Sequence, residues 1–178
     1  DFMNMNDMVI ISVDDHITEP PDMFDQHLSA ADLATAPKFC TDENGKSYWS
    51  YQGMFMPSVG LNAVVGRPLE EYGMEPTSLE QMRKGVYNVD ARIDDMNANG
   101  IAASLNFGTC VGFDGGRFHK APDKTLSLTH LRAYNDWHID EWCGAHPGRF
   151  IPLGVVPYWD PQLMAAEVHR LAEAGCHA

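Results

Sequence analysis

The chain has 178 residues, of which 44% are hydrophobic and 21% are charged, a composition typical of a folded globular domain rather than of a disordered segment. Its 25 acidic and 12 basic residues give a formal net charge of −13. Nucleic acids and acidic membrane surfaces would be repelled by that charge, so we expect neither as a partner.

The four cysteines are Cys40, Cys110, Cys143 and Cys176. They are widely scattered without a C-x-x-C pair, which argues against a disulfide framework or a zinc finger and favours reduced thiols in the cytoplasm. The longest apolar runs are far shorter than the ~20 residues that a bilayer-spanning helix needs. The acidic first residues lack the positive segment of a signal peptide, and because the chain does not begin with Met we expect residues upstream.

The first predicted element is a strand over residues 9–13, whose continuous apolar character is typical of a strand buried on both faces. It ends in Asp14, Asp15 and His16. Side chains two residues apart on a strand point the same way, so we expect Asp14 and His16 to project together and Asp15 to face the opposite side. Such a carboxylate and imidazole can hold a divalent metal, and the alternative is a histidine that only hydrogen-bonds a carboxylate.

A long region without regular alternation follows, and it contains a predicted hairpin. Residues 39–42 and 47–51 are strand-like, and between them Asn44-Gly45 is a strong signal for a type I′ turn. The region is rich in aromatic residues, among them Tyr48, Trp49, Tyr51 and Phe55. We therefore expect it to fold over a pocket or to serve an interface.

From residue 90 onward, helices and strands alternate. Asp90 is placed to cap a helix over residues 91–99, and a strand over residues 101–107 follows. The glycine-rich loop 108–116 fits neither common phosphate-binding motif and is predicted to be a lid. The remaining elements are a helix over about residues 123–145, a strand over 150–156, a helix from Pro161 that is closed by Gly175, and the first step of a strand at 176–178.

This alternation predicts an α/β fold with parallel strands joined by right-handed crossovers. The chain stops where the next strand would begin, which would leave a sheet edge without a partner. We therefore expect the chain to be the N-terminal portion of a longer protein.

Several short motifs, in order along the chain, resemble amidohydrolase-related proteins of the aminocarboxymuconate-semialdehyde decarboxylase type. They are DDH (14–16) with EPPD (19–22), RIDDM (92–96) with GI (100–101), YNDW (134–137), PGRF (147–150), VP (156–157), DP (160–161) and Gly175. No single motif decides the resemblance; the ordered set extends over residues 9–176.

The resemblance implies that residues 1–178 are an incomplete domain, the N-terminal part of a (β/α)₈ TIM-type barrel. It would contain about the first three to four β/α units, with a long insertion over roughly residues 17–88 after strand 1. A complete barrel has eight strands and about 250 residues, more than this chain supplies.

The resemblance also implies one divalent metal at the C-terminal mouth of the strands, bound through H-x-H or E-x-H and by a later histidine and aspartate. Here the matching residues are Asp14 and His16. At the first position, aspartate has a shorter side chain than the histidine or glutamate of the family pattern. Zn²⁺ is favoured, with Mn²⁺ and Fe²⁺ as alternatives. The remaining metal ligands and the catalytic acid or base are expected after residue 178, and no catalytic residue is assignable within this chain.

Three further residues are candidates for substrate binding. Glu19 lies just beyond the strand, where it would orient a ligand or a metal-bound water, or else bond local backbone near Pro20. Asn106 is near the tip of the second strand, and His119 follows the glycine-rich loop. For each of them a structural role is the alternative.

The function implied by the resemblance is that of a metal-dependent decarboxylase or hydrolase acting on a small organic acid, aromatic or cyclic. The sequence does not separate a carboxy-lyase from a hydrolase. The alternative is a metal-free barrel that serves as a non-catalytic scaffold for a ligand or partner. Members of the family often form dimers, so we expect a homodimer or a higher homo-oligomer.

Overall fold

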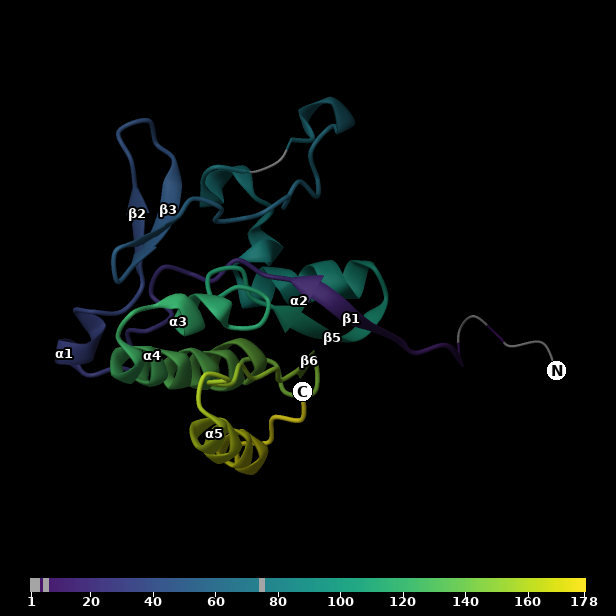
Figure 1. Ribbon diagram of the computed structural model, residues 1–178. Helices are drawn as coiled ribbons and strands as arrows, with labels where there is room; N and C mark the ends of the chain where they lie inside the picture. Colours follow the sequence, from purple (N-terminus) through teal and green to yellow (C-terminus); the bar gives the residue numbers. More distant parts are fainter. Residues whose placement is uncertain (1–3, 5–6, 74–75) are drawn as a thin grey trace.

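The computed structural model describes residue 4, residues 7–73 and residues 76–178. Its central sheet has three parallel strands in the order β1 (Ile10–His16), β5 (Ile101–Phe107) and β6 (Phe150–Ile151). Helix α2 (Val89–Ala98) precedes β5, α4 (Lys124–Trp137) lies between β5 and β6, and α5 (Pro161–Glu173) follows β6 (Figure 1). The predicted α/β alternation with parallel strands is confirmed, and the described residues form an open sheet rather than a closed barrel.

Strand β1 differs from its prediction in two respects. It extends through His16, so the three polar residues that follow residue 13 lie within the strand rather than after it. It is also not buried on both faces, since Val9 beside it and Val13 within it are 74% and 63% exposed. Strand β1 is an edge strand, which pairs with β5 and with no other strand of the described residues.

The segment between β1 and α2 contains a second, antiparallel sheet. Its strands are β2 (Lys38–Thr41), β3 (Ser47–Tyr51) and β4 (Met54–Met56), of which β4 was not predicted. The same segment carries the short helix α1 (Ala30–Leu33) and three 3₁₀ turns, η2 (Leu69–Glu71), η3 (Leu79–Gln81) and η4 (Lys84–Val86).

The predicted hairpin is confirmed, but its predicted turn type is wrong. A type I′ turn requires positive φ at both central residues, whereas in this turn only Gly45 has one, at 78°. The Asp42 carboxylate instead accepts hydrogen bonds from the amides of Asn44 and Lys46, at 2.9 and 2.8 Å. A side chain therefore organises the longer turn.

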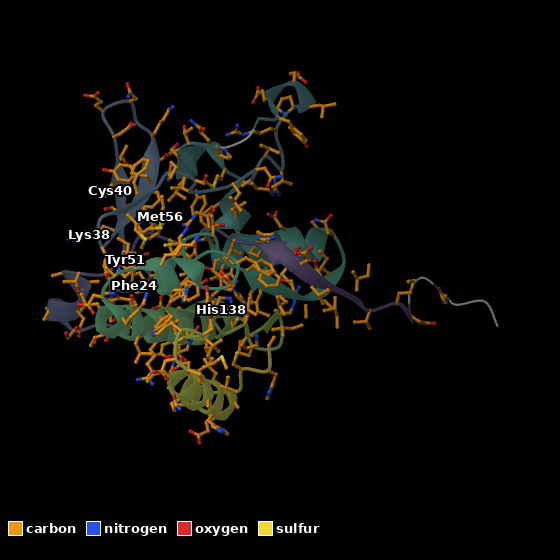
Figure 2. The ribbon with its side chains drawn as sticks, viewed as in Figure 1. Phe24, Lys38, Cys40, Tyr51, Met56 and His138 are labelled. Atoms are coloured by element: carbon orange, nitrogen blue, oxygen red, sulfur yellow. The ribbon has the colours of Figure 1, made fainter. Side chains whose placement is uncertain are left out.

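The hairpin is joined to α4 by a buried contact. The Tyr51 hydroxyl lies 2.9 Å from His130 Nδ1, and the ring of Phe24 packs 6.3 Å from the same imidazole. Figure 2 shows Tyr51 and Phe24 at the base of the hairpin, beside the helix. Burial lowers the pKa of His130, which keeps the imidazole neutral at this junction.

The helices begin at residues whose side chains cap them. Asn88 caps α2 by accepting from the Ala91 amide, so the prediction that Asp90 is the cap is wrong. Asp123 and Asp160 cap α4 and α5. The predicted single helix over about residues 123–145 is α4 continued by a π-helical turn, η5 (His138–Cys143), and the short helix α3 (Gly116–Lys120) precedes it.

Strand β6 has two residues, not the seven predicted for 150–156. Beyond it, the N–H and C=O groups of Val155 are both taken by the side chain of Asn135, at 2.9 Å each, so this backbone bonds a helix side chain rather than a strand. The predicted strand at 176–178 is irregular; one backbone hydrogen bond joins the Gly154 amide to the Ala178 carbonyl at 2.9 Å.

The main core lies between the parallel sheet and the helices. Leu131, Tyr134 and Trp137 of α4 are buried there with Trp142 of η5 and Phe150 of β6. None of the helices in the described part of the chain is both long and apolar enough to cross a bilayer.

Candidate functional site

The carboxyl end of β1 presents Asp14 and His16 on the same side. His16 Nε2 lies 3.6 Å from Asp14 Oδ1, and the two side chains are 47% and 82% exposed, respectively. Both polar groups are therefore available to a ligand at the end of the strand, on the face from which their side chains project.

The register of β1 against β5 is irregular just before this pair. Ser12 pairs with Ser104, but Asp15, three residues later, pairs with Asn106, only two residues farther along β5. One extra residue in a strand bends it and re-aims the neighbouring side chains, which is why such bulges are frequent next to functional sites.

Asp15, between the two residues of this pair, has partners of its own. Its carboxylate accepts a hydrogen bond from the Ser12 hydroxyl at 2.8 Å and forms a 3.1 Å ion pair with Arg92 of α2. The Arg92 side chain is largely buried, so the ion pair fastens the end of β1 to the helix behind it. Asp15 therefore supports the strand end that carries the candidate metal ligands.

The spacing of Asp14 and His16 fits two ligands of one ion. Two donors that each lie about 2.1 Å from a tetrahedral ion are about 3.4 Å apart, close to the observed separation. An oxygen and an imidazole nitrogen suit Zn²⁺, Mn²⁺ or Fe²⁺. Within the described ranges, no cluster brings three His, Cys, Asp or Glu side chains together in a metal-binding arrangement, so this pair would be part of a site.

A cavity of about 270 Å³ adjoins the end of β1. Part of its wall comes from β1 and α2, and part from residues 60–65 of the segment between β1 and α2. Leu61 in that wall has a φ of 44°, a left-handed conformation that side-chain-bearing residues adopt rarely. The cavity is lined by Asp14, Asp15, His16, Thr18, Leu61 and Arg92, among others.

Glu19 is completely buried and holds the loop that follows β5. The Thr109 and Cys110 amides donate to its Oε2 at 3.1 and 2.8 Å. Burial raises the pKa of Glu19 above its ordinary 4.5, although the two amides and the nearby Tyr134 hydroxyl act to lower it. The other carboxylate oxygen, Oε1, is buried without a hydrogen-bond partner among the described residues. Glu19 thus links the loops after β1 and β5.

Two phenylalanines lie next to the Asp14–His16 pair. Phe107, the last residue of β5, pairs with His16 in the sheet, and their ring centroids are 5.7 Å apart. Phe113 comes from the glycine-rich loop and stacks on Phe107, with centroids 4.7 Å apart and planes 21° from parallel. An apolar aromatic surface therefore borders the polar pair.

The other two predicted substrate contacts lie apart from the pair. Asn106 is buried, where it accepts from Trp142 Nε1 at 2.8 Å and donates to the Ser104 hydroxyl at 3.1 Å. Because both polar atoms are occupied, we do not carry Asn106 into the proposed site. The ring of His119 stacks on Tyr158, which follows β6, at 4.5 Å. The structure therefore brings together Asp14 and His16, and neither Asn106 nor His119 with them.

With this geometry established, the fold can be compared with known proteins. A crystal structure of an amidohydrolase from Mycobacterium avium subsp. paratuberculosis K-10 is similar, with a TM-score of 0.68 and 20% sequence identity. The fold is amidohydrolase-like. The match covers 96% of this chain and 47% of the solved chain, so this chain spans about half the length of that protein. No protein-family model and no curated protein matches the chain.

Sequence reasoning missed the roles of Phe107, Phe113 and Arg92. Phe107 is the last residue of the predicted strand 101–107. Its pairing with His16 depends on the register of two strands that are far apart in the sequence. The motif RIDDM contains Arg92, but the chain pattern does not identify Asp15 as its partner. The glycine-rich loop has the sequence character of a lid, and its pattern does not indicate that Phe113 within it stacks on Phe107.

Proposed function

We propose that this chain forms part of a metal-dependent enzyme of the amidohydrolase type, a decarboxylase or a hydrolase that acts on a small organic carboxylic acid. The observation that carries the proposal is the pairing of Asp14 Oδ1 and His16 Nε2 at 3.6 Å, at the carboxyl end of the first strand of an amidohydrolase-like fold. In barrels of this class, chemistry takes place at that end of the strands.

In this proposal Asp14 and His16 hold the ion, with Zn²⁺ favoured and Mn²⁺ or Fe²⁺ as alternatives. A bound ion of this kind would stabilise negative charge on substrate oxygens during decarboxylation, or lower the pKa of a bound water for hydrolysis. Asp15, fixed by Ser12 and Arg92, would keep the two ligands in register. Further ligands and the group that transfers the proton would come from the rest of a longer protein.

The test is the metal content of the full-length protein and of its Asp14→Ala and His16→Ala variants. We expect about one equivalent of a transition metal in the wild type and its loss in both variants, because each removes one donor. His146→Ala is a matched control, since His146 and Asp90 form another partly exposed histidine–aspartate pair, at 2.7 Å, elsewhere on the surface. The control should keep its metal.

A metal-free wild type that binds an organic acid equally well after His16→Ala would instead support the non-catalytic scaffold and overturn the proposal. If metal is present, CO₂ release from candidate carboxylic acids identifies a lyase. Turnover of lactone, amide or ester substrates without CO₂ identifies a hydrolase.

A further inference from the structure

The loop between β5 and α3 carries Phe113 in an unusual environment for a large aromatic side chain. One face of the ring stacks on Phe107, yet the residue is 69% exposed. Isolated exposed apolar residues are common on protein surfaces. This one is different because Phe107 is itself in contact with His16, the residue that forms the candidate metal pair with Asp14.

The first part of this loop is held firmly. Its start is bound to Glu19 through the Thr109 and Cys110 amides, and the Arg117 guanidinium donates to the Cys110 carbonyl at 2.6 Å. These contacts come from a buried carboxylate and from the following helix. The backbone that leads to Phe113 is therefore fixed by the fold before any ligand binds.

The turn that contains Phe113 is equally defined. Gly112 and Gly115 have φ values of 78° and 72°, in the left-handed region that favours glycine. A side chain on Gly115 would also press against Val155, at 3.2 Å. Asp114 Oδ1 accepts from the Gly116 amide at 2.8 Å. The exposure of Phe113 thus results from a specific backbone path.

We infer that Phe113, supported by Phe107, is a specificity-determining residue that packs against the planar ring of a carboxylic acid bound at Asp14 and His16. This inference rests on the proposed metal site, which would receive the carboxylate of the ligand. An aromatic face selects planar rings because offset stacking requires two flat surfaces, whereas a saturated ring contacts it only along its edges. Phe107 and Phe113 would therefore favour carboxylic acids with a planar ring over those with a saturated ring.

The test compares benzoate with cyclohexanecarboxylate, which share the charge and the ring size but differ in planarity. Calorimetric titration of the metal-loaded full-length protein measures both dissociation constants. We expect the wild type to bind benzoate about three- to tenfold more tightly than the saturated acid. Phe113→Leu should bring the ratio close to one, and Phe113→Tyr should keep it.

Phe55→Leu is a matched control. Phe55 is also exposed, at 64%, and its ring also lies 4.7 Å from an aromatic partner, Tyr48, but on the hairpin sheet. The control should leave the ratio unchanged. Metal content should stay at one equivalent in all these variants, because no ligand is removed.

The outcomes separate this inference from the proposed function. A full complement of metal with an unchanged ratio in Phe113→Leu overturns the inference and leaves the metal site intact. A Phe113→Leu protein that unfolds, or loses much more thermal stability than Phe55→Leu, also overturns it, because Phe113 would then be a packing residue in the complete protein. A wild type without metal or affinity for either acid overturns both.

Discussion

Glu19 and Glu167 are both completely buried carboxylates, but their surroundings are different. Glu167, on α5, accepts hydrogen bonds from the Asn135 amide at 2.9 Å and from the guanidinium groups of Arg132 and Arg170. Glu19, close to the candidate site, accepts from two backbone amides, and no cation in the described ranges forms an ion pair with it. Burial raises the pKa of Glu19. At Glu167 burial acts in the same direction, but the hydrogen bonds from Arg170 and Asn135 outweigh it and lower the pKa.

The difference shows how two regions of the molecule hold a buried carboxylate. Between α4 and α5 the fold surrounds a buried charge with positive partners, which is the usual condition for keeping an ionised carboxylate inside a protein. At the ends of β1 and β5 the fold leaves a carboxylate with an uncompensated part of its desolvation cost. Perturbed groups of that kind concentrate near functional sites, as expected if the strand ends serve a ligand.

The largest effect is expected for Glu167→Ala. It removes the shared partner of Arg132, Asn135 and Arg170, and breaking a buried charge network costs about 3 kcal/mol, reduced somewhat here because both guanidinium groups reach solvent. The measurement is the free energy of unfolding by denaturant titration. Glu173→Ala, at the exposed end of the same helix, should change it little. A loss no greater than that of the control would contradict the network account.

A smaller effect is expected for Gly108→Ala. A methyl group at this position would collide with the Tyr134 hydroxyl and with Glu19 Oε1, so the loop or the buried carboxylate must move. Overpacking of this kind costs about 1–3 kcal/mol. Gly73→Ala is a matched control, because Gly73, like Gly108, lies outside the left-handed region, and it has open space around its Cβ. Equal losses in the two variants, measured by thermal unfolding, would mean that Glu19 is not closely packed against Gly108.

The smallest effect is a pH dependence of the unfolding free energy that differs between Glu19 and Glu167. The pKa of Glu19 is raised in the folded protein, so its contribution to stability is present below pH 4.5 and is lost as pH rises through the raised value. Glu19→Gln should therefore gain stability relative to the wild type as pH increases from about 4 to about 8, by about 1.4 kcal/mol for each unit of the pKa shift.

Glu167 has the opposite sign. Its lowered pKa means that its contribution is present above pH 4.5 and is lost as pH falls through the lowered value. The unfolding free energies of Glu19→Gln and the wild type should therefore diverge as pH rises above 4.5, whereas those of Glu167→Gln and the wild type should converge as pH falls below 4.5. Parallel pH profiles would refute the contrast between the two sites.

The sequence by itself determined the order and kind of the main helices and strands from residue 90 to residue 173. The helix that starts at Pro161 was predicted correctly because a capping aspartate and a proline act within one turn. The hairpin was found for a similar local reason, although its turn type was not, because the Asp42 side chain replaced the expected backbone geometry. Strand β6 is short for a reason outside its own residues, since Asn135 of α4 bonds the backbone of Val155.

The candidate metal pair could be proposed from the sequence because a two-residue spacing on a strand places side chains together whatever surrounds them. Tertiary structure alone decided the rest. The register of β1 against β5 placed Phe107 beside His16, and the loop carried Phe113 onto Phe107. The path around Glu19 left it without a cation among the described residues, whereas the packing of α5 on α4 brought Arg132 to Glu167, which already pairs with Arg170 three residues along α5. Pairwise contacts between distant segments have no local sequence signal, so they emerge only when the chain has folded.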